Sequence, residues 1–179
     1  EIIVKEQAKE LLVFTDQGII STGLADLLFN ELRRTQVKFR VFDQLVPEPC
    51  YQDVERLMEE VEKQEGDLIV AVGGGSVMDA AKLCSILKGA PYTVRDLLSE
   101  PGQAKKMRKT VMIPTPCATG SEATCNAIVA IPEQQSKQGI VNEAMIPDYV
   151  ILDSQMIRRL PKGILAATGV DALAHAVEC

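Results

Sequence analysis

The stretch LIVAVGGGSVMDAAK, Leu68 to Lys82, decides the fold of this chain. An apolar run of strand length leads into three consecutive glycines, and a helix-forming run follows at once. Glycine has no Cβ, so the backbone at Gly73, Gly74 and Gly75 can approach a bulky anion closely or adopt a positive φ. A helix that opens near Ser76 would point its free N–H groups at that anion. The stretch predicts a phosphate site, with a dinucleotide as the expected ligand; the alternative is a glycine-rich connection that only turns the chain.

The composition is that of an ordinary globular protein. Its 179 residues are 46% hydrophobic and 25% charged, which is enough for one well-buried core. The net charge of −6 leaves no basic face, so nucleic acid is not expected as a partner. No apolar run reaches the roughly 18 residues that span a bilayer, so no membrane partner is expected. The five cysteines include no CxxC pair, which is typical of reduced thiols and predicts a cytoplasmic protein.

Apolar, β-branched runs alternate along the chain with segments of helical period. The expected strands are 11–15, 37–42, 68–72, 111–113, 128–131 and 150–152, and the expected helices are 24–33, 53–65 and 78–87. This alternation predicts an α/β fold with a mostly parallel sheet and right-handed crossovers. After Pro161 the chain is alanine-rich and helical in pattern. We therefore expect an α/β domain over 1–160 and, over 161–179, the first helix of a second, helical domain.

Asp16 directly follows the first expected strand. Ligands of parallel α/β sheets bind outside the carboxyl ends of the strands. A carboxylate there would accept hydrogen bonds from ribose hydroxyls and repel a 2′-phosphate; the alternative is a helix N-cap or turn residue. In the common Rossmann fingerprint the glycines come first and the acid about twenty residues later. Here the acid comes first, and Met78 stands where the third glycine would fall, which favours a nucleotide-binding fold of another lineage.

The segment IPTPCATGSEAT, residues 113–124, follows the fourth expected strand and is rich in small hydroxylated residues. Hydroxyls such as those of Thr115 and Thr119 suit a loop that binds a phosphate, a ribose or a carboxamide. The alternative is a proline-rich turn whose hydroxyls hydrogen-bond the local backbone.

Asp171 and His175 are four residues apart on the last expected helix. Both side chains therefore project from one face, one turn apart. A carboxylate and an imidazole at this spacing can bind a divalent metal such as Fe²⁺ or Zn²⁺, although two ligands are too few for a tight site. An ordinary ion pair on a helix is the alternative.

Four blocks together make the chain resemble the iron-containing (group III) alcohol dehydrogenases. They are TDQG at 15–18, GGGSVMDAAK at 73–82, PTPCATGSE at 114–122 and ATGVDALAHAVE at 167–178. The resemblance implies a dehydroquinate-synthase-like fold, in which a nucleotide-binding α/β domain precedes an all-helical metal-binding domain. In that comparison the α/β domain lacks its first strand, and the chain is similar to the N-terminal part of such an enzyme.

The resemblance also implies roles for individual residues. Asp16 would approach the adenosine ribose and favour NAD over NADP. The other implied cofactor contacts are Gly73, Gly74, Gly75, Ser76 and Asp79 around the pyrophosphate, Thr115 and Thr119 near the inner phosphate and nicotinamide ribose, and Lys137 and Leu152 elsewhere along the cofactor. Asp171 and His175 would be the first two ligands of the metal, Fe²⁺ or Zn²⁺.

The implied activity is the NAD- and metal-dependent interconversion of small primary alcohols and aldehydes, by a homo-oligomer. The family completes its metal site with two further histidines, whereas this chain contains one His. We therefore expect no catalytic residue beyond the two metal ligands and no activity from the 179 residues alone. Against the usual PTTAGTGSE pattern, the chain differs at Pro116, Cys117 and Ala118, which would alter the nicotinamide pocket.

Two other functions stay open. One is a non-catalytic nucleotide-binding domain or remnant. The other is an enzyme related to glycerol dehydrogenase or dehydroquinate synthase, although the block TGVDALAH at 168–175 resembles the alcohol dehydrogenases more closely.

Overall fold

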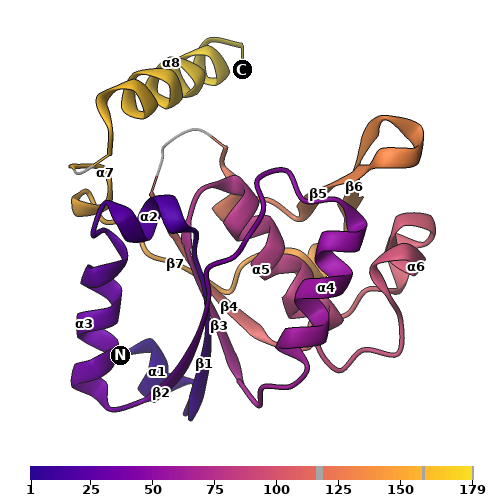
Figure 1. Ribbon diagram of the computed structural model, residues 1–179, viewed down its shortest axis with the longest axis horizontal. Helices are drawn as coiled ribbons and strands as arrows, with labels where there is room; N and C mark the ends of the chain where they lie inside the picture. Colours follow the sequence, from indigo (N-terminus) through magenta and orange to yellow (C-terminus); the bar gives the residue numbers. More distant parts are fainter. Residues whose placement is uncertain (116–118, 159, 179) are drawn as a thin grey trace.

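A parallel sheet of five strands forms the centre of the computed structural model, which describes residues 1–115, 119–158 and 160–178 (Figure 1). Its strands are β1 (Glu10–Phe14), β2 (Lys38–Phe42), β3 (Leu68–Gly73), β4 (Lys109–Pro114) and β7 (Tyr149–Val150). They lie in the order β2-β1-β3-β4-β7, and all neighbours are parallel. The predicted α/β class and mostly parallel sheet are confirmed.

Each face of the sheet has its own core, because successive side chains of a strand point to opposite faces. Leu11 and Val13 of β1 pack with the helices α1 (Ile2–Lys5), α2 (Gln17–Ser21) and α3 (Ala25–Thr35). Leu12 and Phe14 of the same strand pack with α4 (Tyr51–Val61) and α5 (Gly75–Leu87) on the opposite face. Central strand β3 is buried along its whole length, as its continuous apolar sequence predicts.

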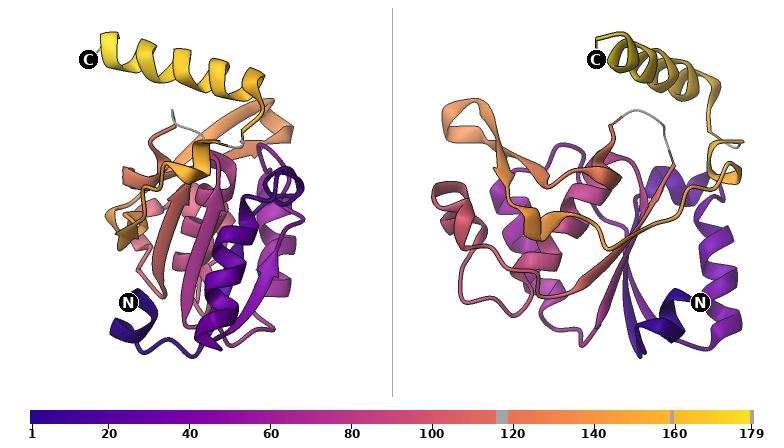
Figure 2. Two further views of the ribbon diagram at one scale, coloured as in Figure 1. Left: turned by 90° about the vertical axis from the view of Figure 1, so that its left-hand side faces the viewer. Right: turned by 180° about the vertical axis from the view of Figure 1, so that it is seen from behind.

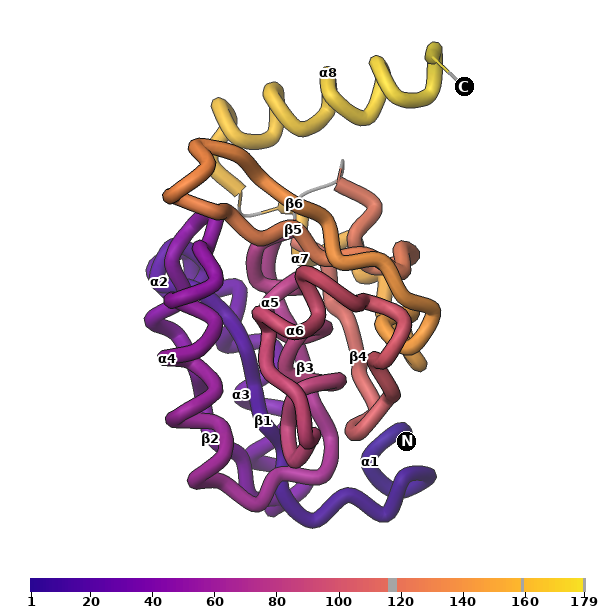
Figure 3. Tube along the Cα trace, turned by 90° about the vertical axis from the view of Figure 1, so that its right-hand side faces the viewer, coloured from indigo at the N-terminus to yellow at the C-terminus, as the bar shows by residue number. Residues whose placement is uncertain are grey.

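A β-hairpin covers the outer side of α5 (Figure 3). It consists of β5 (Asn126–Ile131) and β6 (Ser136–Val141), and its side chains share a third apolar cluster with α5 and α6 (Val94–Ser99). Buried between this cluster and the sheet, α5 is apolar on nearly all sides. The strand expected over 128–131 is present, but it pairs antiparallel with β6 and outside the main sheet. Strand β6 has a polar, mostly exposed sequence, so no apolar alternation predicted it.

Several element boundaries differ from the predicted ones. The helix expected over 53–65 runs from Tyr51 to Val61, because the Asp53 side chain turns back to accept a hydrogen bond from the Cys50 N–H (2.9 Å). The helix expected from residue 78 begins at Gly75, directly at the glycines. Leu152, expected in a strand, lies beyond the end of β7.

The C-terminal helix α8 (Lys162–Glu178) lies apart from the sheet, beyond the carboxyl ends of its strands, and follows the short α7 (Gln155–Arg158) (Figures 1 and 2). The helix expected after Pro161 is thus present, and none of its described residues is buried. The remaining elements are the 3₁₀ turns η1 (Pro101–Gln103), η2 (Ser121–Ala123), η3 (Pro132–Gln134) and η4 (Glu143–Met145). None of the helices in the described ranges is long and apolar enough to cross a membrane.

Candidate functional site

The segments that the sequence singles out meet at the carboxyl edge of the sheet. Asp16 follows β1, the glycine turn follows β3, and Thr115 follows β4. The register pairs Gly73 with Pro114, so β3 and β4 end level, and it pairs Phe14 with Ala71, so β1 ends two residues earlier at the same edge. This is the edge at which parallel α/β sheets bind ligands.

A pocket of about 340 Å³ opens beside the N-terminus of α5. Five residues implied as cofactor contacts line it, namely Gly75, Ser76, Asp79, Thr119 and Lys137. Its other lining residues are Glu48, Pro49, Ser121, Thr124, Asn126, Ile128 and Ala130. A larger pocket of about 430 Å³ between β2 and α4 contains none of the implied contacts, so we take the pocket beside α5 as the candidate site.

The glycines have different roles in this turn. None of Gly73, Gly74 and Gly75 has a positive φ, so the conformational freedom of glycine is not what the turn requires. A Cβ at Gly73 would lie 2.7 Å from Cγ2 of Val77, and Gly73 is therefore needed for the packing of β3 against α5. A Cβ at Gly75 would lie 3.1 Å from Cγ2 of Thr119. Gly75 lets the loop after β4 approach the start of the helix, at the wall of the pocket.

The start of α5 fits a phosphate group. Gly74 is the N-cap and supplies no side-chain hydrogen bond. Among the described residues, no side chain caps the N–H groups of the first turn, so they can bind a ligand. Nearby, the fully buried Thr115 donates its N–H to the Gly73 carbonyl (3.1 Å), while its Oγ1 has no hydrogen-bond partner among the described residues. A buried hydroxyl without a partner is costly, and a polar ligand at this edge would supply one. These observations fit the phosphates and ribose of a dinucleotide.

Asp16 caps a helix. Its Oδ1 accepts a hydrogen bond from the Ile19 N–H (2.9 Å) at the start of α2. The N-cap alternative is thus observed, and it occupies one of the two carboxylate oxygens. Asp16 also forms an isolated β-bridge with Gln44 at the carboxyl edge of the sheet. It is not among the residues that line the pocket.

Of the other implied cofactor contacts, Gly73, Gly74, Thr115 and Leu152 also lie outside the pocket lining. The Leu152 side chain is 76% exposed, although the adjacent Ile151 N–H donates to the Met112 carbonyl (2.8 Å) and keeps this segment beside β4. Residues 116–118, where the sequence departs from the family pattern, lie outside the described residues.

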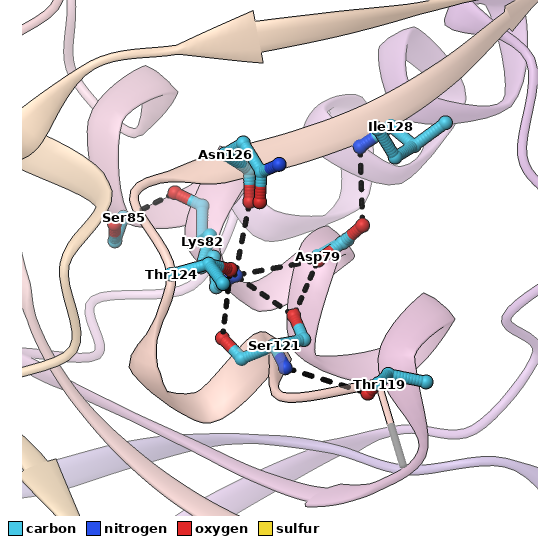
Figure 4. A network of polar contacts seen from close by, with 8 residues as sticks. All are labelled: Asp79, Lys82, Ser85, Thr119, Ser121, Thr124, Asn126 and Ile128. Atoms are coloured by element: carbon cyan, nitrogen blue, oxygen red, sulfur yellow. Dashed lines mark hydrogen bonds and ion pairs between the residues drawn. The ribbon is translucent and has the colours of Figure 1, made fainter. Parts of the chain in front are cut away.

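The most extensive polar network at the site centres on Lys82, a residue that the sequence interpretation did not single out (Figure 4). Lys82 is fully buried. Its Nζ donates to Ser121 Oγ (2.8 Å), Thr124 Oγ1 (2.9 Å) and the Asn126 carbonyl (2.9 Å), and lies 3.4 Å from Asp79 Oδ1. Burial lowers the pKa of this ammonium group, and the Asp79 carboxylate opposes the shift. The sequence did contain a signal for this network, because Lys82 stands among apolar residues three positions after Asp79.

Lys137 reaches the pocket from strand β6. Its Nζ forms an ion pair with Glu48 Oε1 (2.6 Å), and both side chains are largely exposed. Glu48 also has a left-handed backbone (φ 52°), and its N–H lies 3.5 Å from Ser76 Oγ. The pair joins the loop before α4 to the hairpin across the mouth of the pocket.

Asp171 and His175 are brought together as their spacing predicts. Asp171 Oδ1 and His175 Nε2 are 3.7 Å apart on α8, and both side chains are more than half exposed. Across residues 1–115, 119–158 and 160–178, no group of three or more His, Cys, Asp or Glu side chains is arranged to hold a metal ion. The two residues can supply part of a metal site but do not complete one.

Comparison with known proteins shows which family the chain is similar to. The family model described as "Iron-containing alcohol dehydrogenase" matches residues 1–154. The chain is 34% identical over 174 residues to long-chain-alcohol dehydrogenase 1 of Geobacillus thermodenitrificans, covering 96% of this chain and 44% of that one. It is 29% identical over 171 residues to the NAD-dependent methanol dehydrogenase of Bacillus methanolicus, covering 96% and 45%.

Among solved structures, sulfoacetaldehyde reductase from Bifidobacterium kashiwanohense in complex with NAD⁺ superposes with a TM-score of 0.88 at 26% identity, covering 99% of this chain and 47% of that one. The chain therefore spans a little under half the length of the relatives it matches. Since the family model covers most of the sequence and the fold agrees, the chain belongs to the iron-containing alcohol dehydrogenase family.

Proposed function

We propose that this chain is the nucleotide-binding part of an NAD-dependent, metal-dependent dehydrogenase that interconverts small primary alcohols and aldehydes. The observation that carries the proposal is the pocket at the start of α5. It combines an uncapped helix N-terminus with the side chains of Ser76, Thr119 and Lys137, and this combination of free N–H groups, hydroxyls and a cation suits a diphosphate.

The cofactor contacts follow from this placement. The first turn of α5 would hold the pyrophosphate through backbone N–H groups, and the Ser76 and Thr119 hydroxyls would donate to its oxygens. The unpartnered Thr115 hydroxyl would face the ribose or phosphate nearer to the nicotinamide, and Asp16 the adenosine ribose. When bound, the nicotinamide ring accepts or donates the hydride, and the role of the chain is to orient it.

The metal ligands would come partly from α8. Asp171 and His175 present a carboxylate oxygen and an imidazole nitrogen from the same helix face, a donor set that suits Fe²⁺ and Zn²⁺. We propose that residues 161–179 begin the helical domain in which the remaining ligands would lie. The two side chains of this chain are too few to hold a catalytic metal on their own.

The direct test is titration of the 179-residue chain with NAD⁺ by isothermal calorimetry. We expect saturable one-to-one binding that persists in the presence of a chelator, because the pocket contains no metal ligand set. Titration with Zn²⁺ or Fe²⁺ is expected to give only weak binding. The absence of NAD⁺ binding would contradict the proposal. Binding of cofactor without metal is also what a non-catalytic nucleotide-binding domain would show, so this titration tests the cofactor site and not catalysis.

Turnover by these 179 residues is expected to be negligible. With only Asp171 and His175 available, the chain cannot hold the metal on which the alcohol would be activated. The measurement is the formation of NADH in the presence of NAD⁺, a divalent metal and a series of primary alcohols. Robust alcohol-dependent NADH production by this chain would show that the inferred ligand set is wrong.

A further inference from the structure

The carboxylate of Asp79 lies in an unusual place for an anion site. Its side chain is 15% exposed and lines the same pocket as Ser76 and Lys137. A negative charge at this position would repel a diphosphate, because the interaction between charges is strong where solvent screening is reduced.

The structure also shows why the carboxylate is retained. Asp79 Oδ1 accepts a hydrogen bond from Ser121 Oγ (2.6 Å), and Oδ2 accepts one from the Ile128 N–H (3.0 Å) (Figure 4). Asp79 therefore ties α5 to the segment that runs from η2 into β5. This segment forms the opposite wall of the pocket.

Lys82 supplies the matching charge. It lies one turn further along α5, is fully buried, and is 3.4 Å from Asp79 Oδ1. Its remaining contacts are uncharged oxygen atoms of Ser121, Thr124 and Asn126. The ammonium group is thus placed to balance the carboxylate, and it does not reach the pocket surface itself.

We propose that Lys82 is a positioning residue of the anion site: it neutralises Asp79, so that this carboxylate can hold the Ser121–Ile128 wall without repelling the bound diphosphate. The inference rests on the proposed function, since it assumes that the pocket binds a diphosphate. It differs from a purely structural role for Lys82, because the net charge of the Asp79–Lys82 pair, and not only the hydrogen bonds of Lys82, sets the affinity for the diphosphate.

The test compares ADP with adenosine as probes, measured by calorimetry on the chain and on four variants. Lys82→Met removes the ammonium and keeps an unbranched side chain. We expect the affinity for ADP to fall by about tenfold or more, while the affinity for adenosine, which carries no phosphate, changes by less than about twofold. The double variant Asp79→Asn/Lys82→Met removes both charges and is expected to recover most of the affinity for ADP.

Lys88→Met is the matched control. Lys88 follows α5 directly and is 4% exposed, and its Nζ donates to the carbonyl oxygens of Val61 (3.2 Å) and Gln64 (2.6 Å) at the end of α4, away from the pocket. Its loss is expected to lower stability but to leave the affinity for ADP within about twofold. Thermal unfolding of each variant separates the two effects.

The outcomes distinguish the two proposals. If the unchanged chain does not bind ADP, the proposed function fails. If it binds ADP, two results would show that the charge-balancing role is wrong and that Lys82 only stabilises the wall through its hydrogen bonds. One is that Lys82→Met lowers the affinities for ADP and adenosine equally, and the other is that the double variant recovers no affinity for ADP. Should Lys82→Met not fold, Asp79→Asn alone decides: charge balance predicts tighter ADP binding, because an uncompensated ammonium then lies near the anion, whereas a purely structural role predicts weaker binding.

Discussion

Gly75→Asp is expected to reduce the affinity for NAD⁺ by about 100-fold or more. The substitution places a carboxylate at the first turn of α5, where we propose that the pyrophosphate binds, and the two negative charges would compete for the same N–H groups. The added Cβ would also press on Thr119, 3.1 Å away. Aspartate is favoured at the start of a helix, so the fold is expected to keep its stability or gain slightly.

Two controls separate charge from bulk. Gly75→Ala adds the Cβ alone and should lower the affinity for NAD⁺ by less than about tenfold, since Thr119 needs to move by only a few tenths of an ångström. Gly102→Asp adds the same charge in η1, where a Cβ meets nothing within 4 Å, and should leave NAD⁺ binding unchanged. Calorimetry gives the affinities. Two results would show that the pyrophosphate does not bind at this helix. One is an equal loss of NAD⁺ affinity in Gly75→Asp and Gly102→Asp, and the other is a loss below about fivefold in Gly75→Asp.

The second large effect concerns the choice between NAD and NADP. We expect Asp16→Gly to improve the affinity for NADP⁺ relative to NAD⁺ by between about 10- and 100-fold, because it removes the repulsion between the carboxylate and the 2′-phosphate. The measurement is the ratio of the two dissociation constants in the chain and the variant.

The N-cap role of Asp16 calls for a further variant. Asp16→Asn removes the charge but retains a side-chain oxygen that can accept from the Ile19 N–H, so α2 keeps its cap. If the charge of Asp16 sets the preference for NAD⁺, Asp16→Asn should shift the ratio of the two dissociation constants in the same direction as Asp16→Gly, while the thermal stability of the chain is preserved. A preference that is unchanged in both variants would place the adenosine ribose elsewhere.

Much of the fold follows from local patterns. Runs such as Leu68–Val72 are apolar throughout, and only a strand buried on both faces hides such a run from water. The placement of Asp16 and the glycines at one edge also followed, since the carboxyl ends of parallel strands share an edge. Strand β6 was missed, because its polar residues pair with β5 through backbone hydrogen bonds that no side-chain pattern signals.

For the proposed site, sequence order by itself predicted which segments meet, because strand direction fixes the edge at which each connection emerges. Gly75, Ser76 and Thr119 do line one pocket at that edge. Only the tertiary structure decided what individual side chains do there. Asp79 faces Ser121 and Ile128, which are more than 40 residues away, and Lys82 is buried beside it. Such contacts depend on how the hairpin docks on α5, and the local sequence of neither segment encodes that docking.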